Sequence, residues 1–122
     1  MGKKKNPLPF DRAGGVITLQ RRLIESDVYL RLSPPAKVLM TLLQVHWAND
    51  KPIGYGIREA ADKIPCSRRT AMSAFKELTE AGFITMVNES LFNSRTTSKT
   101  RTWKLNWLLY KYKQATNEWK SN

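Results

Sequence analysis

Residues 67–76 combine cationic, hydroxyl and thioether side chains in one short stretch of the chain. An arginine guanidinium binds a phosphate, or the edge of a guanine, through two parallel hydrogen bonds. Serine and threonine hydroxyls can donate to the same acceptors, and a methionine adds an apolar contact. The candidate contact residues are Ser67, Arg68, Arg69, Thr70, Met72, Ser73 and Lys76. This chemistry indicates a polyanionic partner.

The sequence before and within this stretch predicts two helices and a tight turn. Pro65 cannot continue a helix and restricts Ile64, so a first helix from Ile57 should end at or before Ile64. Ser67 is a suitable N-cap for a second helix, because its side-chain oxygen can accept a hydrogen bond from an unpaired amide. A helix, a turn of about two residues and a second helix form a helix-turn-helix, whose second helix reads DNA.

The second helix is predicted to be amphipathic. Its apolar residues recur at spacings of three and four, which places them on one face. These are Ala71, Ala74, Phe75 and Leu78, and the opposite face holds Arg68, Arg69, Ser73 and Lys76. Gly82 is the expected left-handed cap, and Phe83, Ile84 and Val87 begin a strand.

A basic β-hairpin is predicted behind this helix. Strands at 83–87 and about 100–107 are separated by a polar segment, NESLFNSRTTSK, that is too long for a tight hairpin. In the second strand, Trp103, Leu105 and Trp107 should face the core, while Thr102, Lys104 and Asn106 should face water. A hairpin after a recognition helix is a wing. Its candidate DNA contacts are Arg95, Thr96, Thr97, Lys99 and Arg101.

The rest of the chain predicts one domain with two polar ends. Residues 1–15 form a basic arm, whose weaker candidate contacts are Lys3, Lys4 and Lys5. Residues 16–32 mix extended and helical patterns. Ser33 caps a further helix that repeats apolar residues as far as Trp47 and stops at residues 49–50, and residues 53–57 alternate as a brief strand does.

Composition narrows the class of protein. The chain has 122 residues, a size typical of one domain, and 41% of them are hydrophobic. Its net charge of +11 and pI near 10.1 indicate nucleic acid or an anionic membrane surface as partner. No apolar run approaches the roughly 20 residues of a transmembrane helix. The single cysteine, Cys66, rules out an internal disulfide and fits a cytoplasmic location, associated with the nucleoid if the chain binds DNA.

The blocks LSPPAKVLMTLL, GIREAADKI, SRRTAMSAFKELTEAGFI and TRTWKLNW, with a basic loop before the last, follow one another along residues 16–107. This order resembles winged helix-turn-helix proteins of bacterial mobile elements and prophages, which include transcriptional regulators and replication-initiator-like proteins. The resemblance implies an α+β winged-helix fold, with a three-helix core and a C-terminal wing, and DNA binding. Residues 108–122 fall outside the shared pattern, and Met72 stands where a polar residue is more usual.

We therefore expect sequence-specific binding of double-stranded DNA by a transcriptional regulator. The recognition helix would enter the major groove, where an arginine pairs with guanine and Met72 can touch a thymine methyl. The wing would hold the backbone or enter the minor groove. Because Arg68 and Arg69 differ by about 100° around the helix, the sequence leaves open which of them reads a base. The alternative is that Arg68 and Arg69 form a solvated helix end, but the motif around them favours the DNA-binding interpretation.

The C-terminal residues suggest a second surface. Spacings of four, three and four would place an apolar stripe on one short helix. The stripe consists of Leu108, Tyr112, Ala115 and Trp119. If it does not fold back on the domain, it can bind a second copy, so we expect a homodimer as one possibility.

Other functions have less support in the sequence. No paired carboxylates, activated nucleophile or phosphate loop suggests an enzyme, and no cofactor or small-molecule ligand is indicated. His46 is the only histidine and is expected to be structural, and Cys66 has no partner for a metal site. The alternatives to a regulator are a plasmid or phage replication-initiator-like protein, a winged-helix protein-interaction module, and an RNA-binding protein.

Overall fold

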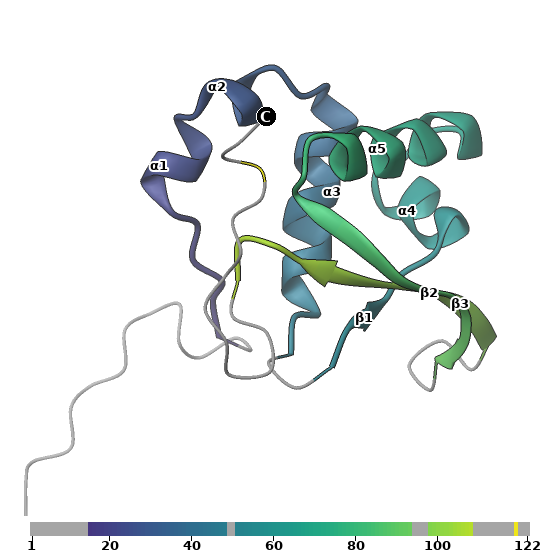
Figure 1. Cartoon of the computed structure of the whole chain (residues 1–122). Coiled ribbons are helices and arrows are strands. Elements are labelled where there is room, and N and C mark those ends of the chain that lie inside the picture. The colour runs from purple at the N-terminus through teal and green to yellow at the C-terminus, as the bar shows by residue number, and fades with distance from the viewer. Residues whose placement is uncertain (1–14, 49–50, 94–97, 109–118, 120–122) are drawn as a thin grey trace, which may run out of the picture.

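The computed structural model describes residues 15–48, 51–93, 98–108 and 119, with the backbone alone for 88–93 and 98–99. Within these residues the fold is α+β, with five helices and a three-stranded antiparallel sheet (Figure 1). The elements are α1 Arg21–Ile24, α2 Asp27–Leu30, α3 Pro34–Val45, β1 Ile53–Gly54, α4 Ile57–Lys63, α5 Arg68–Glu80, β2 Ile84–Asn93 and β3 Ser98–Leu105. In these ranges no helix is long and apolar enough to cross a membrane.

Helix α3 begins where the sequence predicts. The Ser33 hydroxyl accepts a hydrogen bond from the amide of Ala36 at 3.4 Å, and two prolines fill the first helical positions. The helix ends at Val45, earlier than expected. The amides of His46 and Trp47 bond to carbonyls three residues back, which tightens the last turn and uses carbonyls that would otherwise be unpaired.

The predicted helix, turn and helix are confirmed. α4 ends at Lys63, before Pro65, and the Ser67 hydroxyl accepts a hydrogen bond from the amide of Thr70 at 3.0 Å to begin α5. At the other end of α5, Gly82 takes the left-handed conformation with φ of 87°. Its amide bonds to the Thr79 carbonyl and the next amide bonds to the Leu78 carbonyl, which is the Schellman arrangement.

The sheet has the order β1-β3-β2, and its hairpin is longer than predicted. The polar segment expected to be a long connection instead continues both strands, because backbone pairing does not require apolar side chains. Register shifts between Met86 and Asn88 and between Asn88 and Leu91 accommodate this part of the ladder. β1 is shorter than expected, because Ile57 begins α4 instead of extending the strand.

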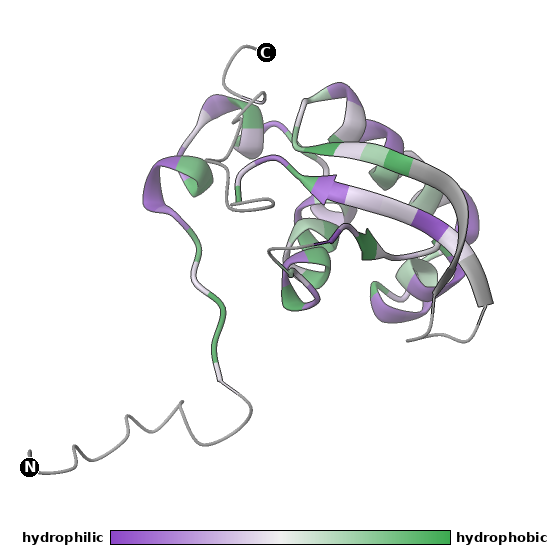
Figure 2. Ribbon diagram, turned by 60° about the horizontal axis from the view of Figure 1, so that its bottom comes forward, coloured by the Kyte–Doolittle hydropathy of each residue, from purple (hydrophilic) through white to green (hydrophobic). Residues whose placement is uncertain are grey.

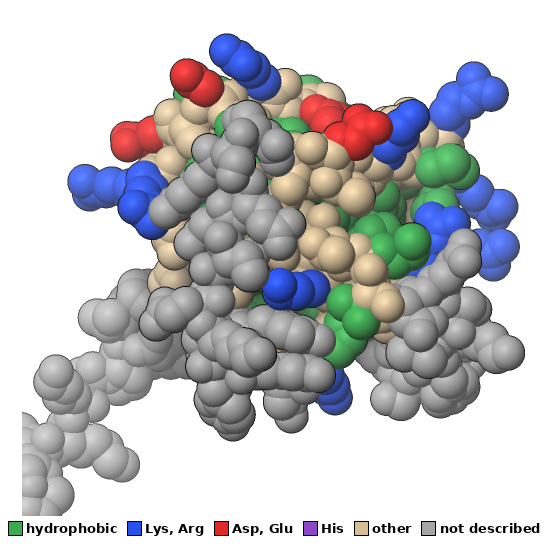
Figure 3. Space-filling model, in the orientation of Figure 1, with side chains coloured by type: hydrophobic (Ala, Val, Ile, Leu, Met, Phe, Trp, Pro, Cys, Tyr) green, Lys and Arg blue, Asp and Glu red, His purple; other side chains and the backbone are tan. Residues whose placement is uncertain are grey.

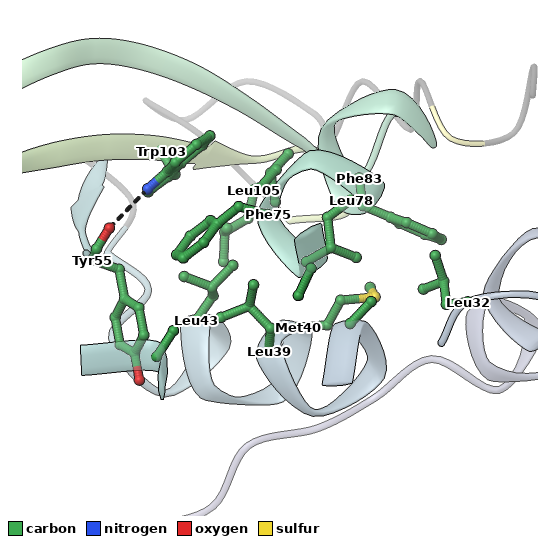
Figure 4. Close-up of a cluster of buried hydrophobic side chains, with 14 of the residues drawn as sticks. Leu32, Leu39, Met40, Leu43, Tyr55, Phe75, Leu78, Phe83, Trp103 and Leu105 are labelled. Atoms are coloured by element: carbon green, nitrogen blue, oxygen red, sulfur yellow. Dashed lines mark hydrogen bonds between the residues drawn. The ribbon is translucent and has the colours of Figure 1, made fainter. Parts of the chain in front are cut away.

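Helices α3 and α5 cover one face of the sheet, and the core lies between these two layers (Figures 1, 2 and 4). Phe75 of α5 stacks on Trp103 of β3, with ring centroids 4.9 Å apart. The indole N–H of Trp103 donates to the Tyr55 carbonyl at 3.0 Å, which satisfies its buried polar group. The predicted inward faces of α5 and β3 are thus confirmed.

A buried amide links the segment before α1 to the residue Trp107 after β3. The Gln44 side chain on α3 donates to the Thr18 carbonyl at 2.7 Å and accepts from the Trp107 indole at 3.0 Å. Each of these polar groups therefore has a partner inside the protein. The extended residues before α1 are held beside α3 in this way.

The predictions that Asn106 and Thr102 face water are wrong. Asn106 is 0% exposed, and its side-chain amide donates to the Gly82 carbonyl at 2.9 Å and to the Thr85 hydroxyl at 3.0 Å. β3 ends at Leu105, so the alternation stops before Asn106. Thr102 is buried because β3 is the central strand and has β1 and β2 on either side.

Two residues of the predicted C-terminal stripe, Leu108 and Trp119, pack within their own chain. Trp119 is 3% exposed and stacks on Phe83 of its own chain, with centroids 5.5 Å apart. Leu108 packs against the same core. Tyr112 and Ala115 lie outside the described residues. The ring of Trp119 therefore contributes to the core of its own chain. The homodimer stays a prediction.

Candidate nucleic-acid interface

The outward face of α5 is polar and basic. Arg69, Ser73 and Lys76 recur at spacings of four and three, lie on one side of the helix, and are all exposed. The buried residues of α5 face the opposite way, toward α3 and the sheet. We call these three residues the outer stripe. It presents a guanidinium, a hydroxyl and an ammonium group to solvent.

A second line of residues on α5 faces the hairpin. Arg68, Met72 and Phe75 recur at spacings of four and three, so they lie along one side of α5. The ring of Phe75 stacks on Trp103 of β3. The side of α5 that carries Arg68 is therefore the side nearest the sheet, whereas Arg69 lies on the outer stripe. The two arginines thus have different surroundings, which their adjacent positions in the sequence do not reveal.

The hydroxyls at the start of α5 are used for capping. Ser67 accepts from the amide of Thr70 and donates to its hydroxyl, both at 3.0 Å. Thr70 lies two helical turns before Glu77, so these two residues share one side of α5. Met72 lies on the other side of the helix. Ser67 and Thr70 fix the position at which α5 begins. The three residues of the outer stripe come after this position, on successive turns of the helix.

Glu77 is a positioning residue that the sequence analysis missed. Its carboxylate accepts from the Ser33 amide and from the Ser33 hydroxyl, each at 2.7 Å. In a capping box, a Glu or Gln three residues after the N-cap would make the first of these bonds, but α3 has Ala36 there. The distant Glu77 replaces it and ties α5 to the start of α3. The sequence signal for this role is the absence of Glu or Gln at position 36, which leaves the Ser33 amide without a capping-box partner.

Replacing Glu77 by alanine is expected to lower the free energy of unfolding by about 1.5–3 kcal/mol, because two hydrogen bonds to a charged group are lost. Glu80→Ala is the matched control, since it removes the same charge from an exposed position on the same helix. It should change the unfolding free energy by about 0.5 kcal/mol or less. Urea unfolding measures both, and equal losses in the two variants would contradict this role.

Two of the predicted wing contacts lie on β3 of the hairpin. Arg101 is half-buried, and the backbone of Lys99 pairs with Phe92. Arg95, Thr96 and Thr97 lie outside the described residues, as do Lys3, Lys4 and Lys5. In Figure 3, Lys and Arg side chains gather around the N-terminal end of α5. The acidic side chains visible on that face lie over α1, α2 and the C-terminal end of α5.

The described residues contain no group of three His, Cys, Asp or Glu side chains placed to hold a metal ion. His46 instead lies against Tyr55, with ring centroids 5.8 Å apart, and Cys66 is partly buried in the turn before α5. These two residues therefore pack as parts of the core and its edge.

No protein-family model, curated protein or solved structure matches this chain. The resemblance of residues 16–107 to winged helix-turn-helix proteins consequently stays a prediction that rests on the sequence pattern. The chemistry of α5 and the adjacent hairpin is what supports a function.

Proposed function

We propose that this protein is a winged helix-turn-helix protein that binds double-stranded DNA in a sequence-specific manner. The observation that carries the proposal is the outer stripe of α5, in which Arg69, Ser73 and Lys76 are exposed together. An α-helix fits the major groove of B-DNA, and residues near its N-terminus reach the base edges. α5 begins at a capped N-terminus and has a free polar face of this kind.

The contacts divide into base and phosphate contacts. Arg69, in the first turn, is suited to pair with the O6 and N7 atoms of a guanine. Lys76 lies two turns further along and is suited to a phosphate, because an ammonium group acts as a point charge. The β2–β3 hairpin serves as the wing on the adjacent backbone or minor groove. Because Glu77 is bonded to Ser33, its carboxylate is held away from the outer stripe.

The proposed role is regulation of transcription, and initiation of replication on a mobile element is the alternative. Both roles require the same binding chemistry. Selection of bound sequences from a random library would supply the site. Its position beside a promoter or an origin would then separate the two roles.

Binding should depend steeply on salt. If roughly six phosphates are neutralised, the logarithm of the affinity should fall with the logarithm of salt concentration at a slope of about −5. Lys76→Gln should reduce the size of that slope by about 1, because one phosphate contact is lost. Lys51→Gln, which removes an exposed lysine just before β1, is the matched control and should leave the slope unchanged.

Fluorescence anisotropy with a labelled duplex, titrated at salt concentrations from about 50 to 200 mM, measures the slopes. Absence of salt-sensitive duplex binding at low ionic strength would contradict the proposal. Equal slopes for the Lys76 and Lys51 variants would remove the outer stripe from the interface. The first result would favour the protein-interaction module, and the second would place DNA binding on another surface of the protein.

A further inference from the structure

Two methionines are exposed beside the basic face of α5. Met72 on α5 is 54% exposed, and Met86 on β2 is 44% exposed. Moving a long apolar side chain out of water lowers the free energy, so a partner that covers both methionines is favoured. Figure 3 shows hydrophobic side chains on the surface between α5 and the hairpin, with Lys and Arg side chains next to them.

The sheet register places these methionines on either side of one aromatic stack. Met86 is directly opposite Trp103, and side chains that pair directly in an antiparallel ladder lie on the same face of the sheet. Trp103 stacks on Phe75, and Met72 precedes Phe75 by one helical turn. Met72 therefore borders the stack from the helix, and Met86 borders it from the hairpin. We call these two residues the methionine pair.

The surroundings of the methionine pair restrict what can cover it. Arg68 lies one turn before Met72, and Arg69 and Lys76 lie on the neighbouring outer stripe. An apolar site with three cations nearby favours a polyanion that also carries an apolar group. In the major groove of DNA, the C5-methyl group of thymine is the apolar feature that a side chain can contact. Met72 lies in the N-terminal half of α5, the part of a recognition helix that reaches base edges.

We propose that Met72, supported by Met86, contacts the methyl group of a thymine in the bound DNA, so that this thymine is part of the recognised sequence. This inference rests on the proposed DNA binding. It adds that the apolar surface selects a thymine. Arg69 and Met72 then read different features of the same groove. The arginine donates hydrogen bonds to a guanine, and the methionine packs against a methyl group.

The test compares one selected duplex made with thymine and with uracil, which differ only in the C5-methyl group. For the wild-type chain, replacing thymine by uracil should lower the affinity about fourfold for each methyl group contacted, as expected for one buried carbon. For Met72→Ala, the two duplexes should bind within about twofold of each other, because the contact is absent in both. Fluorescence anisotropy at fixed salt measures all four affinities.

Two control variants separate this contact from other effects. Lys76→Ala should weaken binding to both duplexes equally and keep the difference between thymine and uracil. Val45→Ala removes a similarly exposed apolar side chain from α3 and should change neither affinity. A circular dichroism spectrum of each variant shows whether the fold is retained.

Three results would overturn the inference. Equal wild-type affinities for the two duplexes, with salt-sensitive binding intact, would overturn the methyl contact and leave the DNA-binding proposal standing. A thymine preference that persists in Met72→Ala would assign the difference to DNA shape. Absence of any duplex binding would overturn both the methyl contact and the proposed function.

Discussion

Arg69→Glu is expected to lower the affinity for a selected duplex by about 100-fold or more. The change removes a bidentate base contact, which contributes about 1–3 kcal/mol, and it places a carboxylate against phosphates. The guanidinium lies on the outer stripe of α5 and is exposed, so the substitution disturbs no buried group. Isothermal titration or fluorescence anisotropy at moderate salt measures the loss.

The matched control is Arg22→Glu on α1. It changes the net charge by the same amount at another exposed arginine, on an element distant from α5 (Figure 1). We expect a loss of less than about tenfold, because the charge change acts only through the overall field, which salt screens. Equal losses in the two variants would show that binding depends on total charge and not on the α5 surface.

A third variant, Arg69→Lys, separates charge from base recognition. A lysine keeps the positive charge but cannot form two parallel hydrogen bonds to a guanine. The salt slope should therefore stay near the wild-type value, while discrimination between the selected duplex and a scrambled duplex falls by about 10-fold. A lysine variant that discriminates as well as the wild-type chain would assign base reading to another residue.

Trp119→Ala is expected to lower the free energy of unfolding by about 3–5 kcal/mol, the usual cost of removing a buried tryptophan. The ring is almost fully buried and stacks on Phe83, next to the turn that ends α5. Folded domains are stable by only about 5–15 kcal/mol, so the loss is a large part of the total. Urea unfolding measures it, and sedimentation should show an unchanged mass.

Two further variants make the Trp119 result specific. Trp119→Phe retains an aromatic ring for the stack and should recover much of the lost stability. Trp47→Ala removes a tryptophan that is 39% exposed and should have the smaller effect. If Trp119→Ala left stability unchanged but halved the sedimenting mass, Trp119 would belong to an interface between copies and its packing on Phe83 of the same chain would be contradicted.

Local sequence was sufficient to predict the two helices and the turn. Pro65 and Ser67 act on the residues next to them, and Gly82 supplies the left-handed conformation that ends α5. The apolar spacing that ends at Leu78 reports burial on one face directly. Each of these signals works within about one helical turn of the chain, and each agrees with the structure.

The length of the hairpin could not be predicted in the same way. Polar residues after Val87 indicate a loop by composition, yet the backbone of β2 continues to Asn93 by pairing with β3. The prediction that Asn106 faces water is wrong for a related reason. The alternating pattern gives no sign that β3 ends at Leu105 and that the next side chain turns inward to hold the Gly82 carbonyl.

The sequence by itself determined that a capped, basic, amphipathic helix follows a tight turn, because caps, breakers and periodicity act between near neighbours. Only the tertiary structure decided which side of that helix each arginine occupies relative to the hairpin. It also decided that Glu77 caps α3 through Ser33 and that Trp119 packs on Phe83. These contacts join residues more than thirty positions apart. They form because the folded core brings the residues together, and no local pattern encodes which distant residue will be the partner.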